Sequence, residues 1–268
     1  MSRNFLPNRQ LLEISGADAK KFLQGLVSND VFKASATNLI YAAMLNAQGR
    51  FLYDFFIFEK DEKLMIDCAA TKRDEILKKL NFYKLRTPIE IKKNDEILVA
   101  QSFSNHGFRD PRSEKIGHRF YATKDELIAS DADLMSEETY NFLRIENKIP
   151  EGESDLTSEK SLILEFNFDN LHAISYEKGC YIGQELTART HYKGEIRKKL
   201  FHVTLPQNAV EKGSEISCEG KSVGIILSSI FHENQLHALA LVRLPDDSDE
   251  ENFTNKLECE NKKISVIN

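Results

Sequence analysis

Short apolar runs with strand-like alternation recur along most of this chain, and the polar turns between them are short. In the first part of the chain such runs occur at residues 9–15, 40–46, 50–58 and 64–68. Strands joined by short turns pair in an antiparallel manner, because a parallel pair needs a long crossover connection. The pattern therefore predicts antiparallel sheets, with a hairpin turn at Ala47-Gln48-Gly49.

Helical signals alternate with these strands. Ser15-x-x-Asp18 and Thr71-x-x-Asp74 have the spacing of a capping box, and each precedes an apolar pattern of helical period. A third helix is expected over residues 136–148, with Ser136 at its N-cap. Further strands are expected at residues 89–91, 97–103 and 119–122, and a surface loop at 151–160. Strands and helices mixed in this way predict an α+β fold.

The pattern changes after Lys199. Short strand-like runs follow one another at residues 200–205, 215–218, 222–230, 236–244 and 256–267, with glycines between or within them. Regularly spaced short strands are typical of a small barrel or sandwich. We therefore predict two domains, an α+β region over residues 1–196 and a C-terminal β-barrel over residues 197–268.

The most unusual stretch is Lys178-Gly179-Cys180-Tyr181-Ile182-Gly183-Gln184-Glu185. It lies between a predicted strand at residues 162–168 and a predicted helix at 184–192. The positive end of the helix dipole and the charge of Lys178 both favour the thiolate form of Cys180, so this side chain is a candidate nucleophile or soft ligand. The residues alone leave a second interpretation open, a buried and inert cysteine in a tight turn.

The stretch resembles the signature Lys-Gly-Cys-Tyr-x-Gly-Gln-Glu of the YgfZ family. The members of that family are folate-binding maturation factors for iron-sulfur proteins and distant relatives of the glycine-cleavage T-protein, an aminomethyltransferase. Supporting matches occur at residues 15–19, 22–30, 48–54 and 144–150. The resemblance implies a T-protein-like folate-binding region with antiparallel sheets and helices, a small β-barrel after it, and tetrahydrofolate or a derivative as the cofactor.

The resemblance also implies roles for single residues. Asp54 falls on the aspartate that works near the reactive nitrogens of folate, and Glu146 on the glutamate that hydrogen-bonds the pterin ring. Arg189 is expected to bind the folate tail, and Gln184 and Tyr53 complete the expected folate site. From the residues alone, Asp54 faces solvent, a base or a ligand, because an unpaired carboxylate is costly to bury. Without the resemblance, Glu146 and Arg189 read as ordinary exposed helix residues, Arg189 in an ion pair with Glu185.

Local charge agrees with an anionic ligand near Cys180. Between Glu177 and Lys199 there are six basic residues and three acidic ones, an excess of three positive charges. The carboxylates of a folate glutamate tail suit such a stretch; the alternative for several of these residues is a solvated basic helix face.

Three functions follow from these features. The first is a tetrahydrofolate-binding accessory factor for assembly or repair of iron-sulfur proteins, in which Cys180 and Lys178 are the working residues and the partners are client or assembly proteins. The second is a folate-dependent transferase of the aminomethyl type, although the T-protein has no counterpart of the Lys-Gly-Cys-Tyr motif. The third is a binding module with a structural cysteine.

Cysteine and histidine usage predicts no metal site. Cys68, Cys180, Cys218 and Cys259 are far apart in the sequence without a Cys-x-x-Cys pair, and the seven histidines show no ligand spacing. Cluster sites usually draw on several thiolates. The chain is therefore not expected to hold an iron-sulfur cluster with ligands of its own.

Composition limits the partners and the location. The chain has 268 residues, 41% of them hydrophobic and 29% charged, and a formal net charge of −6. This charge argues against general nucleic-acid binding. No run approaches the roughly 18 apolar residues of a membrane helix, and residues 1–10 lack the apolar core of a signal peptide. We therefore expect a cytoplasmic protein without a membrane partner.

Overall fold

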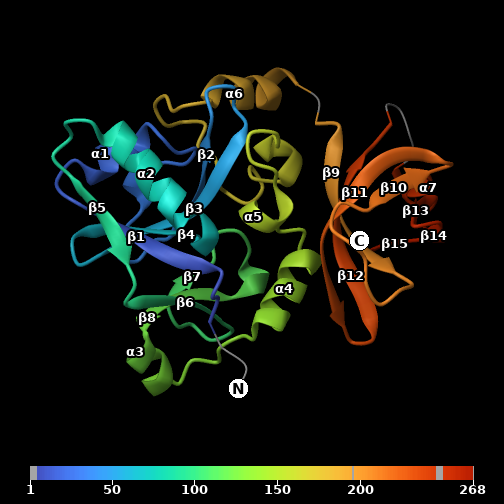
Figure 1. The fold of residues 1–268 in the computed structure, drawn as a ribbon, viewed down its shortest axis with the longest axis horizontal. Coiled ribbons are helices and arrows are strands. Elements are labelled where there is room, and N and C mark those ends of the chain that lie inside the picture. Colours follow the sequence, from blue (N-terminus) through green and yellow to red (C-terminus); the bar gives the residue numbers. More distant parts are fainter. Residues whose placement is uncertain (1–4, 195, 246–249, 268) are drawn as a thin grey trace.

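The computed structural model describes residues 5–194, 196–245 and 250–267 of the chain. Its first layer is a five-stranded antiparallel sheet in the order β2-β3-β4-β1-β5 (Figure 1). The strands are β1 (Arg9–Ser15), β2 (Ile40–Leu45), β3 (Phe51–Lys60), β4 (Lys63–Ala69) and β5 (Glu90–Asn94). The expected hairpin joins β2 to β3 through residues 46–50.

Two helices cover one face of this sheet. They are α1 (Ala19–Gln24) and α2 (Arg73–Lys84), and short 3-10 turns lie at η1 (Val31–Lys33) and η2 (Ala70–Lys72). Leu23 of α1 and Leu80 of α2 belong to the same buried cluster as Ile14 and Phe55 of the sheet. This burial supplies most of the stability of such short helices.

The opposite face of the sheet packs on a second, three-stranded sheet of order β6-β8-β7. Its strands are β6 (Ile97–Ser102), β7 (Phe108–Arg109) and β8 (His118–Thr123); the 3-10 turn η3 (Glu114–Ile116) precedes β8 and helix α3 (Lys124–Ala129) follows it. Phe58 of β3 stacks on Tyr121 of β8 with ring centroids 4.2 Å apart. The two sheets therefore share one aromatic core.

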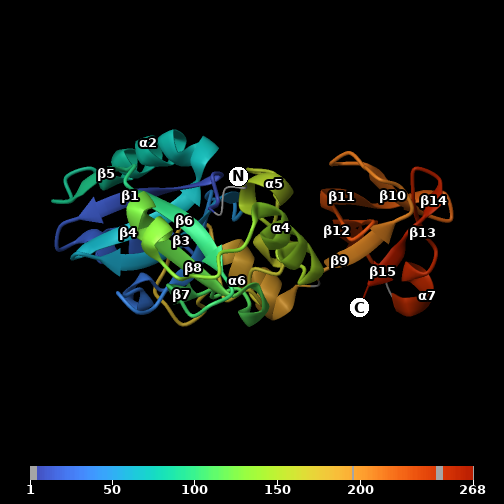
Figure 2. The same cartoon turned by 90° about the horizontal axis from the view of Figure 1, so that it is seen from below.

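Three short elements follow in the middle of the molecule: α4 (Glu137–Glu146), α5 (Gly152–Asp155) and η4 (Ile163–Phe166). In both views, α4 and α5 lie between the sheets of the first part and the C-terminal strands (Figures 1 and 2). Helix α6 (Gln184–Lys193) lies along the top of the molecule in Figure 1 and leads into the C-terminal strands.

The C-terminal part is a seven-stranded antiparallel sheet that curls into a nearly closed barrel, in the order β14-β13-β10-β11-β12-β9-β15. Its elements are β9 (Lys198–Leu205), β10 (Glu215–Cys218), β11 (Lys221–His232), β12 (Gln235–Arg243), α7 (Glu250–Thr254), β13 (Leu257–Cys259), β14 (Lys262–Lys263) and β15 (Ser265–Ile267). The side chains of Leu239 and Leu241 of β12 pack outside the barrel core, in the buried cluster that contains Tyr140 and Ile145 of α4. The barrel and the first part are therefore packed together.

Several local predictions are wrong. Residues 162–168 do not form a strand but contain the 3-10 turn η4, because Ile163, Leu164 and Phe166 are buried by a turn rather than by a sheet face. The two proposed capping boxes are also absent: α1 and α2 begin after Asp18 and Lys72, neither of which makes a side-chain cap. A capping box does open α3, at Thr123, and Ser136 caps α4 as expected.

Candidate functional site around Cys180

The loop that carries Cys180 is seated on the β2–β3 hairpin by two glycines. Gly183 has a φ of +83°, and a Cβ atom there would lie 2.4 Å from the carbonyl oxygen of Asn46. Gly49, with a φ of +71°, would place a Cβ 2.8 Å from that of Leu186. Only glycine tolerates both the left-handed backbone and this close approach. The start of α6 is thereby fixed against the hairpin turn.

Lys178 holds the other end of this loop. Its Nζ atom donates to the backbone carbonyl oxygens of residues 24, 27 and 29, at 2.6, 2.6 and 2.9 Å. Burial lowers the pKa of Lys178 to about 8, and the nearby Asp30 carboxylate opposes that shift. The ammonium form satisfies all three carbonyls with its three donors. Lys178 thus anchors the Cys180 loop to the turn after α1, a role that the sequence alone did not indicate.

Cys180 itself is exposed, whereas the other three cysteines are buried. Burial raises the pKa of Cys68 to about 12 and also raises the pKa of Cys218 and Cys259. A Cβ atom added to the preceding Gly179 would meet nothing within 4 Å, so the backbone beside Cys180 is also open to solvent. In the described parts of the chain, no group of three or more His, Cys, Asp or Glu side chains is placed to hold a metal ion.

Asp54 lies in a buried ionic network rather than on an open surface. Its side chain is 3% exposed, and its Oδ2 accepts hydrogen bonds from Arg9 Nη1 and Tyr41 Oη, both at 3.2 Å. Burial raises the pKa of Asp54, and the Arg9 guanidinium opposes this shift. Of the three possibilities that the sequence left open, the structure selects pairing with a base.

The same network extends through residues that the sequence analysis did not identify. Arg9 Nε also pairs with Asp67 at 2.7 Å, and Arg119 Nε bonds the second oxygen of Asp67 at 2.7 Å. Asp110, Arg112, Tyr140 and Glu151 continue the chain of buried bonds. Asp67 lies in an apolar strand, as Asp54 does. Because an unpaired carboxylate is costly to bury, the same sequence argument could have identified Asp67 as a residue that needs a partner.

The remaining residues of the predicted folate site are spread over the molecule. Tyr53 points to the sheet face opposite Asp54, and its hydroxyl donates to Glu75 at 2.5 Å. Glu146 is exposed at the end of α4. Gln184 accepts from the backbone N–H of Tyr181 at 3.2 Å. Arg189 is exposed on α6 and forms no ion pair with Glu185, although both residues are described.

A cavity of about 280 Å³ lies beside Asp54 and Tyr53 and is also lined by Lys72, Gly152 and Lys212. Neither Glu146 nor Arg189 lines it. Residues 151–160, expected as a surface loop, contain α5, and a Cβ atom on Gly152 would lie 2.1 Å from Asp54 Oδ1. Helix α5 thus covers the Asp54 carboxylate, which already accepts hydrogen bonds from Arg9 and Tyr41. The residues predicted to bind folate therefore do not surround a single pterin-sized site in this structure.

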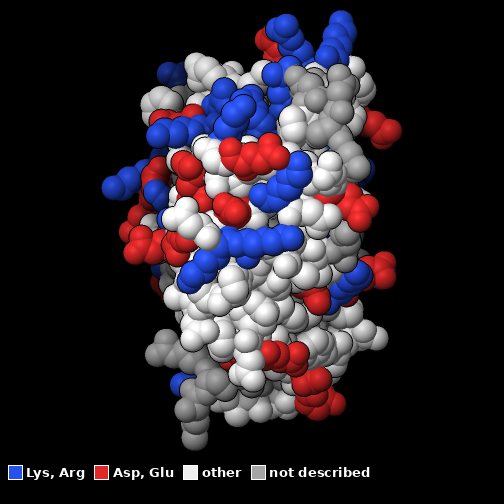
Figure 3. Space-filling view, turned by 90° about the vertical axis from the view of Figure 1, so that its right-hand side faces the viewer, with Lys and Arg blue, Asp and Glu red and all other residues white. Residues whose placement is uncertain are grey.

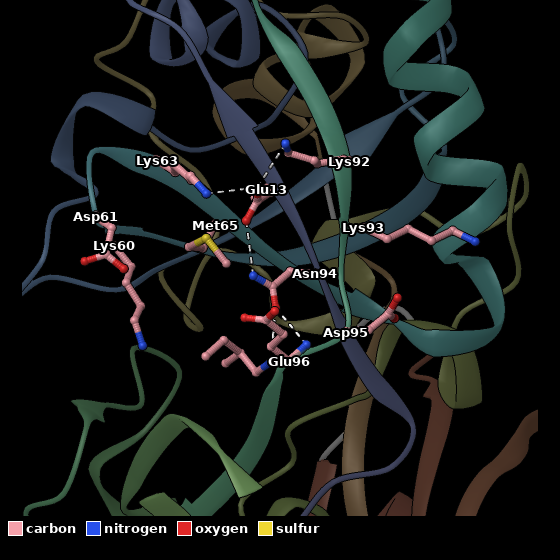
Figure 4. A pocket seen from close by; sticks show the side chains of 11 residues that line it. Glu13, Lys60, Asp61, Lys63, Met65, Lys92, Lys93, Asn94, Asp95 and Glu96 are labelled. Carbon is pink, nitrogen blue, oxygen red and sulfur yellow. Dashed lines mark hydrogen bonds and ion pairs between the residues drawn. The ribbon is translucent and has the colours of Figure 1, made fainter. Parts of the chain in front are cut away.

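The cavity shown in Figure 4 is a second hollow of about 460 Å³, over β1, β4 and β5. Glu13 forms its floor and accepts from Lys63 Nζ and Asn94 Nδ2, both at 3.1 Å. Lys92 approaches the same carboxylate at 3.9 Å, whereas Lys93, which also lines the cavity, directs its ammonium group away from Glu13 and pairs with Asp74 (Figure 4). The charges of this hollow are therefore largely satisfied within the chain.

Comparison with known proteins gives three findings. Residues 197–268 match the family model described as the CAF17 C-terminal β-barrel domain. The fold resembles the crystal structure of the glycine cleavage system aminomethyltransferase T from Bartonella henselae, with a TM-score of 0.74 at 15% identity, over 98% of this chain and 84% of that one. The predicted T-protein-like fold with a C-terminal barrel is thereby confirmed. At this identity the likeness concerns the fold alone.

Sequence relatives are named iron-sulfur cluster assembly factor IBA57, mitochondrial. The human protein is 32% identical over 82% of this chain and 72% of its own length, and the mouse protein 31% over 89% and 76%. The homolog from Pyricularia oryzae is 34% identical, but the chain spans only 56% of its length, and about half of the length of other fungal relatives.

The expected cytoplasmic location is contradicted by these relatives, which are named as mitochondrial proteins. Composition does not predict the cellular location, because targeting signals are separate from the residues that form the folded domain. Among the described residues, none of the helices combines the length and apolarity that a membrane crossing requires.

Proposed function

Because the chain belongs to the IBA57 family of iron-sulfur cluster assembly factors, we propose that it supports the assembly of iron-sulfur clusters on other proteins, with the Cys180 thiol as its working group. The YgfZ family named from the sequence is the bacterial relative of this family, so the sequence identified the broader group correctly. The observation that carries the role of Cys180 is its exposure on a loop that Lys178 and Gly183 hold in place.

Cys180 acts in this proposal as a ligand to iron of the transferred cluster. The thiol loses its proton to solvent when the sulfur–iron bond forms, as metal ligation by cysteine requires. One thiolate does not hold a cluster, whose irons draw on about four ligands. Cys68, Cys218 and Cys259 are buried away from the surface. The remaining ligands must therefore come from the partner, which makes the cluster a shared cargo.

The test is complementation. Cells that lack their own factor of this family receive the wild-type chain or Cys180→Ser, and the activities of [4Fe–4S] and [2Fe–2S] enzymes are measured. We expect Cys180→Ser to lose most of the restored activity while the protein accumulates to normal levels. Cys218→Ala is the matched control, because it removes a buried thiol. Full complementation by Cys180→Ser would leave Cys180 a structural residue.

Tetrahydrofolate binding is a second proposal, and the cavity beside Asp54 is the observation that favours it. Lys72 and Lys212 on its wall suit the carboxylates of a folate tail. Calorimetry with tetrahydrofolate separates two locations. Weaker binding in Lys72→Ala and Lys212→Ala supports the cavity, whereas weaker binding in Glu146→Ala, by roughly 1.5 to 3 kcal/mol for a charge-assisted pair, supports the site predicted from the sequence. Absence of binding to the wild-type protein contradicts both.

The aminomethyl-transferase alternative is tested by a one-carbon transfer assay with tetrahydrofolate. The Asp54 carboxylate, which this reaction would use, is 3% exposed, covered by α5 and paired with Arg9. We therefore favour the accessory factor over the transferase.

A further inference from the structure

Helix α6 is exposed to an unusual degree. Of its ten residues only Thr187 is buried. Glu185, Arg189, Tyr192 and Lys193 follow one another at intervals of four, three and one residues, so they lie along one side of the helix. All four are exposed, and the ring of Tyr192 retains 67% of its accessible surface. We call Arg189, Tyr192 and Lys193, which form the C-terminal half of this side, the α6 face; Glu185 lies one turn closer to the Cys180 loop.

The α6 face carries two positive charges. Arg189 and Lys193 form no ion pair with any residue that the structure describes. Below the end of α6, Lys198 of β9 is the cross-strand partner of Arg243 of β12, which sets two positive charges opposite each other. Such pairs are unfavourable unless an anion lies nearby. Among the described residues Lys198 has one, Glu165, at 3.5 Å, and none forms an ion pair with Arg243.

The distribution of charge over the surface agrees with this local count. Figure 3 shows the molecule from the barrel end, and its Lys and Arg side chains gather towards the top, the end at which α6 lies in Figure 1. Acidic side chains lie among them, and the charged side chains at the lower end of that view are mostly acidic. A positive region at one end of a chain whose net charge is −6 favours acidic partners at that end only.

We propose that the α6 face docks an acidic surface of the partner protein and so places that partner over Cys180. This inference rests on the proposed function, since it names the surface by which the cluster partner is held. A helix rises about 1.5 Å per residue, so α6 extends about 14 Å from the Cys180 loop and carries its face in the half farther from that loop. Exposed tyrosine and arginine are the residues that carry most binding energy at interfaces.

An acidic protein is favoured over nucleic acid or a lipid surface for two reasons. The chain as a whole is acidic, so an extended polyanion is repelled by most of its surface. The exposed Tyr192 ring of the face offers apolar contact area that a protein partner buries.

The first test reverses the charge of the face. Arg189→Glu/Lys193→Glu is compared with Lys78→Glu/Arg86→Glu, which makes the same change in net charge at exposed positions in the middle of α2 and just after it. In the complementation assay we expect the first variant to lower iron-sulfur enzyme activity about tenfold, because reversed charges repel an acidic partner. The control should stay within about twofold of the wild type.

The second test removes the aromatic ring. Tyr192→Ala is paired with Phe82→Ala, since both rings are exposed, by 67% and 74%. We expect Tyr192→Ala to reduce complementation severalfold and Phe82→Ala to leave it unchanged. Thermal unfolding of each purified variant, with a midpoint equal to that of the wild type, shows that the effect does not come from misfolding.

The outcomes separate this proposal from the proposed function. If the wild-type chain itself does not complement, the proposed function fails. If the wild type complements and Cys180→Ser does not, but the Arg189/Lys193 reversal complements as well as its control, only the docking proposal is overturned. Binding of the purified wild type to phosphatidylcholine/phosphatidylglycerol vesicles or to a single-stranded oligonucleotide, lost in the reversal variant, would assign the face to a polyanion and also overturn it.

Discussion

At the scale of single residues, Cys180 differs from the other cysteines in what surrounds its sulfur. The sequence predicted that the charge of Lys178 stabilises the thiolate. In the structure the Lys178 ammonium group instead donates to three backbone carbonyl oxygens at the end of α1 and after it. Lys178 therefore acts on Cys180 by holding its loop in place. Asp54 is similar, because its charge is used inside the chain by Arg9.

The accessibility of the cysteines predicts an order of alkylation. Iodoacetamide at pH 7.5 should modify Cys180 at least roughly tenfold faster than the other three, because alkylation needs a thiolate that the reagent can reach. Burial of Cys68 keeps the reagent away and disfavours the thiolate, because it raises the pKa of this thiol to about 12. Burial also raises the pKa of Cys218 and Cys259. Mass spectrometry of the labelled peptides measures the rates.

Labelling in concentrated guanidinium chloride is the control, since all four cysteines should then react at similar rates. If Cys218 or Cys259 were labelled before Cys180 in the folded protein, the proposal that Cys180 is the working thiol would lose its basis.

At the scale of elements, the β2–β3 hairpin and the start of α6 form one unit. Gly49 and Gly183 allow their backbones to meet, and Leu186 of α6 covers the hairpin turn. Ile182 N–H donates to the carbonyl oxygen of Gly25 at 3.2 Å, which ties the unit to the end of α1. The loop that presents Cys180 is therefore held from two sides.

The two glycines of the Cys180 loop provide a matched pair of substitutions. Gly183→Ala should lower the free energy of unfolding by roughly 2 to 3 kcal/mol, because it combines a left-handed backbone with a clash against the Asn46 carbonyl. Gly179→Ala should change it by less than about 0.5 kcal/mol, since its Cβ meets open space. Urea denaturation of both variants measures the difference. Equal effects would show that the close packing of α6 on the hairpin contributes nothing to stability.

At the scale of the whole molecule, α4 joins the barrel to the first part. Phe142 of α4 stacks on His232 with ring centroids 4.1 Å apart and meets His237 edge-on at 5.0 Å. His202 Nε2 lies 2.9 Å from His237 Nδ1 and is hydrogen-bonded to it. Glu138, Glu146, Lys148 and Glu233 are the charged groups nearest to these rings.

This joint should weaken in acid. Burial, then the neighbouring His237 and Lys148, lower the pKa of His202 to about 4. The unfolded chain takes up the proton near the ordinary value of about 6.5, so it binds more protons than the folded chain between these values. Stability is therefore lost as pH falls through that window, by roughly 1 to 3 kcal/mol from this group.

Urea denaturation at pH 7 and at pH 4.5 measures the loss. His202→Gln keeps a polar group for His237 without the titration, so its stability should depend less on pH than that of the wild type. The same pH dependence in both proteins would show that His202 is not the group responsible.

The sequence by itself determined the elements whose pattern is local: the antiparallel strands of both parts, the cap of α4 by Ser136, and the position of the Cys180 motif just before a helix. It also carried the resemblance that led to the correct broad family. These succeed because alternation, capping and motif spacing depend on residues close together in the chain.

The tertiary structure alone decided which charges meet. Arg9 reaches Asp54 and Asp67 across 45 and 58 residues, and Lys178 reaches the turn after α1 across about 150. Residues 162–168 became a turn, and α5 closed over Asp54, because burial in a core built from distant segments outweighs local propensity. Pairings of this kind leave no mark on local spacing, so only the packed chain shows that Asp54 is covered and that Cys180 stays exposed.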